Sequence, residues 1–165
     1  MNRLSLLKTF TAILQVTGKL ILFFFCPFVL FIAIFPEKGP SKLYEVFEPL
    51  TAIEIAMLII LFLGFALFVH ALSLFRKLLS LFSQKILFDD GVVKNLDHIG
   101  KAVIAGYITI ATITCLDDIF AEEKPSILLG IILSCIFLGT GLFFLVLSSV
   151  FRSAKMIKEE NDLTL

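Results

Sequence analysis

The sequence predicts an all-α integral membrane protein: a bundle of four transmembrane helices with a cytoplasmic interfacial helix between spans two and three. Composition is the first observation, because 59% of the 165 residues are hydrophobic and only 17% are charged. Soluble domains carry about a quarter charged residues, so a soluble enzyme, a secreted disulfide scaffold and a nucleic-acid-binding domain are excluded. The second observation is that the apolar residues gather in four blocks.

Crossing a bilayer takes about 20 helical residues; the second and fourth blocks are long enough outright, the first with an N-terminal extension, and the third with Lys101 and Asp117 at the two membrane surfaces. The predicted spans of this single membrane domain, residues 1–165, are about 15–35, 50–72, 99–117 and 126–150. Lys19 is expected to reach the interface at the start of the first span, and Pro27 within it is expected to bend the helix. Small residues four positions apart favour close helix contact; they occur at Ala52/Ala56, Ala102/Gly106, Gly130/Ser134 and Cys135/Gly139.

The longest connection, residues 73–98, carries its own helical signal. Apolar and polar residues between 73 and 83 recur at helical spacing with a basic face, which predicts an interfacial helix lying on the inner leaflet. Asp89 is then expected to cap the helix that enters the third span. The tail, residues 151–165, is expected to stay helical to about Glu160.

The basic residues are distributed unevenly along the chain. Eleven of the fourteen lie in the N-terminal segment, around the 73–98 connection and in the tail. The positive-inside rule therefore places both termini in the cytoplasm. The lipid bilayer is the first partner, and the basic side favours contact with anionic head groups.

Two short patterns carry a family resemblance. In the first, Phe88 and Asp89 open a helix that reaches Leu96, Ile99 and Gly100 at the membrane. In the second, an acidic pair precedes Asp-Leu-Thr and a final aliphatic residue; its positions include Glu160, Asp162, Leu163 and Thr164. Together they are similar to the bacterial domain-of-unknown-function family numbered 2975, which consists of small four-span membrane proteins.

The resemblance implies a location and a partner. Its members are bacterial, so it implies a multi-pass protein of the cell (inner) membrane. They are often encoded beside a small helix-turn-helix repressor, so the resemblance implies a cytosolic DNA-binding partner. Direct binding of nucleic acid by this chain is not expected.

A few polar residues fall within the predicted spans. Glu54 lies roughly 7 Å down the second helix, where it either binds a cation or proton, pairs with an outer-loop lysine, or is solvated at the interface. Asp117 closes the third span, and Thr109 and Thr112 share a face of it. These residues form a speculative intramembrane polar site, although packing explains the threonines equally well.

The sequence contains no catalytic arrangement that we recognise. It lacks a nucleophile–base–acid set, a phosphate-binding loop and a metal-binding motif, so we expect no enzyme activity, no cofactor and no metal site. The leading hypothesis is a non-enzymatic interaction or regulatory protein that engages a cytosolic partner. The alternative is a small transporter, channel subunit or toxin-immunity protein that uses the bundle interior, and four spans then require a homo-oligomer to make a pathway.

Overall fold

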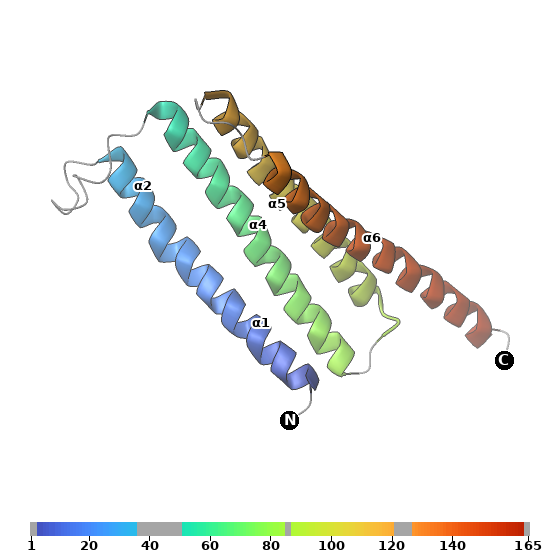
Figure 1. Cartoon of the computed structure of the whole chain (residues 1–165). Coiled ribbons are helices and arrows are strands. Elements are labelled where there is room, and N and C mark those ends of the chain that lie inside the picture. The colour runs from blue at the N-terminus through green and yellow to red at the C-terminus, as the bar shows by residue number, and fades with distance from the viewer. Residues whose placement is uncertain (1–2, 36–50, 85–86, 121–126, 164–165) are drawn as a thin grey trace.

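The computed structural model describes residues 3–35, 51–84, 87–120 and 127–163, and the regular structure in these ranges is entirely helical. The helices are α1 (Arg3–Leu20), the π-helix η1 (Ile21–Phe25), α2 (Cys26–Ile34), α4 (Ala52–Ser83), α5 (Asp90–Phe120) and α6 (Ile127–Leu163) (Figure 1). Four segments are long and apolar enough to cross a membrane: Ser5–Ile32, Ala52–Ser83, Asp90–Cys115 and Gly130–Leu163. The all-α, four-span prediction is therefore confirmed, and the chain has the architecture of a multi-pass membrane protein.

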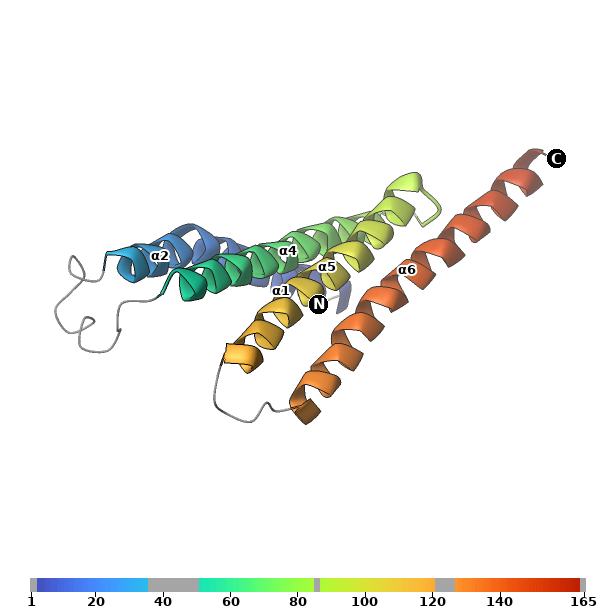
Figure 2. The ribbon, with the colours of Figure 1, turned by 90° about the horizontal axis from the view of Figure 1, so that it is seen from above.

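The helices form an open bundle. α5 packs against both α4 and α6, whereas α1 and α2 lie along α4 and make no backbone contact with α5 or α6 among the described residues (Figure 1, Figure 2). Both chain termini lie at the end where α4 finishes and α5 begins. We call this the basic end, because most of the lysines and arginines are there.

A separate interfacial helix between spans two and three is not found in the described part of the chain. Residues 73–83 instead continue α4 without a break, and the helix ends at the turn of Gln84. The apolar stripe assigned to the inner leaflet packs on protein, since Leu74, Leu78 and Leu79 are buried. An amphipathic pattern has the same period whether lipid or a neighbouring helix covers its apolar face, so the sequence did not separate the two cases.

The best-packed part of the molecule lies toward the basic end. Val92 and Leu96 of α5 are fully buried there, and Leu78 and Ile99 are each only 2% exposed. These residues belong to one hydrophobic cluster that joins α4 to α5, with partly buried side chains of α6 packed against it. The cluster extends beyond the predicted spans, whose own large apolar side chains are largely exposed, as expected for surfaces that face lipid.

Glycines mark the closest approaches between helices. Gly64 of α4 faces Gly106 of α5, and Gly100 of α5 faces Gly141 of α6. The expectation that Ala102/Gly106 serves close packing is confirmed, since Ala102 is buried. Of the pair Gly130/Ser134, Ser134 is hydrogen-bonded to Tyr107 of α5, whereas Gly130 and Gly139 meet no neighbouring helix within 4 Å of a Cβ position in the described ranges.

The first span contains a widened turn before its proline. The backbone N–H of Cys26 donates to the carbonyl of Ile21, five residues back, and Pro27 follows immediately. Because proline has no N–H, the regular bonding pattern is interrupted here, and a π-turn of this kind accommodates the interruption. The helix nevertheless continues to Ile34.

Three phenylalanine pairs join α4 to α6. Their ring centroids lie 5.2 Å, 6.2 Å and 6.2 Å apart, and the pairs are Phe68–Phe137, Phe75–Phe144 and Phe82–Phe151. Successive members are seven residues apart on each helix, which is the spacing that keeps one face of a helix against a neighbour. We call this set the phenylalanine ladder; it links α6 to α4 through side chains, and the two helices run in the same direction.

Candidate functional site

The segment that opens α5 holds the end of α6. The Phe88 ring lies 6.4 Å from that of Phe151, and the ammonium of Lys158 lies 5.7 Å from the Phe88 ring centroid. Lys155 Nζ lies 2.6 Å from Asp90 Oδ1. We call these five residues the tail clamp. It combines aromatic contact, a cation–π contact and an ion pair, so it anchors the C-terminal part of α6 to the start of α5.

The charged pair of the tail clamp lies outside the predicted spans 99–117 and 126–150. A hydrogen bond from Lys155 holds the pKa of Asp90 below its ordinary value, and Asp90 in turn raises the pKa of Lys155. Glu159, one turn further along α6, also pairs with Lys155 at 3.4 Å. Each group therefore favours the charged form of its partner, and the ion pair is retained at neutral pH.

The first sequence motif has a structural explanation at most of its positions. α5 begins directly after Asp89, whose carbonyl accepts the backbone N–H of Val92 at 3.0 Å. Leu96 and Ile99 fill the hydrophobic cluster, at 0% and 2% exposed. Gly100 lies against the backbone of α6. These side chains form the core that supports the site, and Phe88 is the motif residue that contacts the tail.

The second motif lies beyond the tail clamp. Glu160, Asp162 and Leu163 are exposed, and no hydrogen bond or ion pair engages Glu160 or Asp162 within the described ranges. Thr164 lies outside the described residues. The structure therefore brings the first motif against α6 at residues 151–158 and leaves the second motif projecting from the basic end.

The tail has an unoccupied outer face. Met156, Glu160 and Leu163 are spaced four and three residues apart, so they share one side of α6; we call this side the tail face. It lies away from the clamp residues, because Phe151, Lys155 and Lys158 share the other side. Met156 is 52% exposed and Leu163 is 87% exposed. α6 reaches farther at the basic end than α4 or α5 do (Figure 1, Figure 2).

The described residues of the speculative intramembrane site make their hydrogen bonds locally. Glu54 belongs to a capping box: its Oε2 accepts the Thr51 N–H at 2.6 Å, and its own N–H donates to Thr51 Oγ1 at 3.3 Å. Thr109 and Thr112 each donate to a carbonyl of their own helix at 2.8 Å. The Asp117 side chain lies outside the described residues. No hydrogen bond joins Glu54 to either threonine in the part of the chain that the structure describes.

Sequence reasoning missed the α6 half of the tail clamp. Phe151, Lys155 and Lys158 lie more than 60 residues from Phe88 and Asp90, so no local pattern connects them. The available signal was the seven-residue spacing of phenylalanines in both helices, which places Phe151 beside Phe82. Phe82 lies close to the turn that leads to Phe88.

The family described as "Protein of unknown function (DUF2975)" matches residues 38–165. The chain belongs to this family. No curated protein and no solved structure matches it. The part shared with DUF2975 contains α4, α5, α6 and the whole tail clamp, whereas α1, η1 and α2 precede it. Family membership confirms the resemblance inferred from the two short motifs.

Proposed function

We propose that this protein is a non-enzymatic membrane interaction protein that presents the α6 tail to a cytosolic partner. The observation that carries the proposal is the tail clamp, which holds one side of the tail while leaving the tail face exposed. A helix that is fixed in orientation loses less conformational freedom when a partner binds it. Residues 73–83 of α4 support the tail within the same packed end instead of forming a separate interfacial helix.

The chemistry of the tail suits a basic partner with an apolar groove. Met156 and Leu163 are two exposed apolar anchors seven residues apart, the spacing used when a helix docks into a groove. Glu160 lies on the same side of the helix, and Glu159 and Asp162 add exposed acidic side chains to the rest of the tail. Small DNA-binding proteins carry basic surfaces, so a helix-turn-helix regulator of the kind suggested by the family resemblance fits this surface.

We further propose that the protein lies in a bacterial cell (inner) membrane with both termini in the cytoplasm. The positive-inside rule supports this orientation, since eleven of the fourteen basic residues fall at or near the basic end. The tail would then be on the side where a cytosolic regulator is present.

The alternative function, a transporter, channel subunit or toxin-immunity protein, has less support. It relied on Glu54, on the threonine-rich third span and on Pro27. Glu54, Thr109 and Thr112 make their hydrogen bonds within α4 and its cap or within α5. It would also need a homo-oligomer to form a pathway.

The test is affinity purification of the full-length chain from its native membranes in mild detergent, with Met156→Ala and Leu163→Ala combined. We expect the wild type to retain a small DNA-binding protein in stoichiometric amount. The variant should lose it, because interface anchors typically cost more than 1 kcal/mol each when truncated. The matched control is Val146→Ala with Val150→Ala, which truncates two exposed apolar side chains on the lipid-facing part of α6. Equal recovery from both variants, or no soluble partner from the wild type, would overturn the proposal.

A further inference from the structure

Two hollows lie on the same side of α1. The first is polar and opens between α1 and α4 at the basic end; its lining is Lys8, Thr9, Ala12, Arg76 and Ser80. It contains two cationic side chains and two hydroxyls, which are the groups that bind phosphate oxygens.

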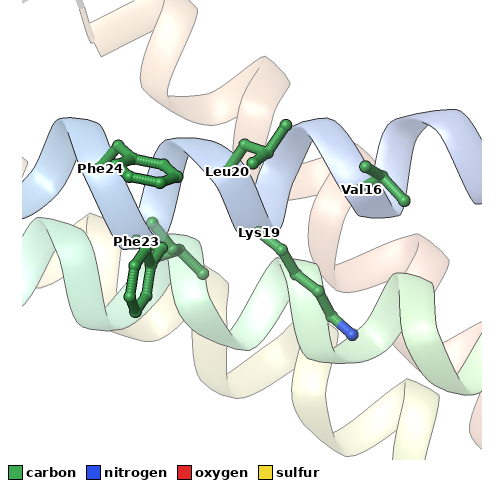
Figure 3. A pocket seen from close by; sticks show the side chains of 6 residues that line it. Val16, Lys19, Leu20, Phe23 and Phe24 are labelled. Carbon is green, nitrogen blue, oxygen red and sulfur yellow. The ribbon is translucent and has the colours of Figure 1, made fainter.

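The second hollow is apolar and lies further along the first span. Its lining is Val16, Lys19, Leu20, Leu22, Phe23 and Phe24 (Figure 3). It adjoins the π-turn, where the helix is widened before Pro27. In Figure 3 the Lys19 side chain runs along the helix toward the Val16 end of the hollow, that is, toward the basic end.

The two hollows follow one another along one face of α1, which we call the strip. Lys8, Ala12, Val16, Lys19 and Phe23 follow each other at intervals of three or four residues, so they share one face of the helix. The strip therefore changes from basic to apolar over about 20 Å along α1. A phospholipid has the same order of chemistry, with an anionic head group followed by acyl chains.

Side-chain hydrogen bonds between α1 and α4 adjoin the polar hollow. Gln15 is only 8% exposed; its Nε2 donates to Ser73 Oγ at 2.8 Å, and its Oε1 accepts from Arg76 Nη1 at 3.3 Å. Lys8 donates to Ser83 Oγ across the same seam. These contacts hold α1 against α4 and fix the guanidinium of Arg76 at the mouth of the hollow.

The cations of this strip have no carboxylate partner in the described ranges. The ion pairs found there involve Lys101 and Lys155, which lie on α5 and α6. Lys8, Lys19 and Arg76 are thus three positive charges along one seam without a neutralising side chain. A bound anion that is not part of this chain would neutralise these positive charges.

The depth of the strip fits the head-group layer. The second span is predicted to end near residue 72, so Arg76 lies roughly 6 Å beyond it by helical rise. The interfacial layer of a bilayer is about 5–7 Å thick on each side. This predicted depth places Arg76 at the level of the phosphates, and the first predicted span, about residues 15–35, places Leu20 and Phe23 at the level of the acyl chains.

We propose that this α1–α4 seam binds one anionic phospholipid. Lys8 and Arg76 hold its phosphate, Lys19 approaches the phosphate from the membrane side, and one acyl chain lies over Val16, Leu20 and Phe23. The apolar continuation favours a lipid over free phosphate, which would use the polar hollow alone. The seam shares no residue with the tail clamp.

Native mass spectrometry of the full chain, titrated with dioleoyl-phosphatidylglycerol, tests the proposal. Combining Lys8→Gln with Arg76→Gln should weaken binding about thirtyfold, because each basic side chain near an anionic lipid contributes about fivefold. The matched control, Lys94→Gln with Arg152→Gln, removes two exposed positive charges elsewhere at the basic end and should leave binding unchanged. Equal loss in both double variants would overturn the proposal, since it would show general charge attraction.

The source of the phosphate and the apolar part are tested separately. Phe23→Ala with Phe24→Ala should weaken binding of the lipid, whereas Phe28→Ala with Phe31→Ala, which are also exposed but lie on α2, should not. Dioleoyl-phosphatidylcholine, which has the same chains and no net charge, should bind weakly. If inorganic phosphate in excess displaced the lipid, or if the phenylalanine pairs behaved alike, the seam would be a site for a soluble anion and the lipid assignment would be wrong.

Discussion

Single glycines set the distance between α5 and α6. A Cβ on Gly100 would lie 2.8 Å from the carbonyl oxygen of Gly141. A Cβ on Gly141 would lie 2.4 Å from Cγ1 of Ile104. Real Cβ atoms do not approach other atoms this closely, and a backbone oxygen in a helix cannot move aside alone. The inter-helix hydrogen bond from Ser148 to the carbonyl of Val93, at 2.9 Å, depends on the same close approach.

We therefore predict that Gly100→Ala destabilises the bundle by about 1–3 kcal/mol, the usual cost of overpacking. The measurement is reversible unfolding in mixed detergent micelles, followed by circular dichroism. Gly139→Ala is the control, because nothing lies within 4 Å of its position; removing a glycine from a helix should leave stability unchanged or raise it by up to ~1 kcal/mol. Equal stability of the two variants would mean that α5 and α6 are farther apart than described.

Glu54 has a local structural role that the sequence already indicates. The sequence from Thr51 to Glu54 has the Thr-x-x-Glu spacing of a capping box, and the structure contains both reciprocal bonds. Its position within an apolar block drew attention to an intramembrane charge instead. At the residue scale the information was present, because a capping box depends on four consecutive residues only.

At the scale of elements, the phenylalanine ladder explains why α4 and α6 are both much longer than a membrane span. Its last pair, Phe82–Phe151, lies beyond the predicted spans and leads directly to the Phe88 contact of the tail clamp. Side chains of α4 and α6 therefore remain in contact beyond the predicted spans. As a result, the tail extends from a part of α6 that is packed against the rest of the bundle.

A double-mutant cycle tests this ladder. We expect Phe75→Leu and Phe144→Leu to couple by about 0.5–1.5 kcal/mol, the range measured for aromatic pairs, in micellar unfolding. The control cycle combines Phe68→Leu with Phe151→Leu. These residues belong to different pairs of the ladder, so their effects should add. Additive effects in both cycles would contradict the parallel arrangement of α4 and α6.

Some structural elements can be predicted from the sequence and others cannot. The four apolar blocks predicted four helices correctly, since burial in lipid needs only length and apolar composition. The course of residues 73–83 was mispredicted as a separate helix, because periodicity cannot tell which surface covers Leu74 and Leu78. The tail clamp could not be predicted at all, since Asp90 and Lys155 meet only after α5 and α6 have packed.

At the scale of the whole molecule, α4 is the shared element. It supports α1 and α2 on one flank and α5 on the other (Figure 2). The proposed lipid seam and the tail clamp therefore lie on separate parts of the same basic end. An exposed basic end of this kind restricts how the molecule can insert, since positive segments are retained in the cytoplasm.

The orientation is the last prediction, and single cysteines test it. The native Cys26, Cys115 and Cys135 are not disulfide-bonded and are first replaced by alanine. Ile53→Cys, exposed at the start of α4, should react with a membrane-impermeant maleimide in intact cells. Ser153→Cys, exposed on α6 at the basic end, should react only after the membrane is permeabilised.

The two positions control for each other, because residue 53 lies at the start of α4 and residue 153 lies near the end of α6, which runs in the same direction. The reverse labelling pattern would place the tail face outside the cell and rule out a cytosolic partner. Labelling of both sites in intact cells would mean that the protein inserts in two orientations, and the charge asymmetry would then be too weak to orient the bundle.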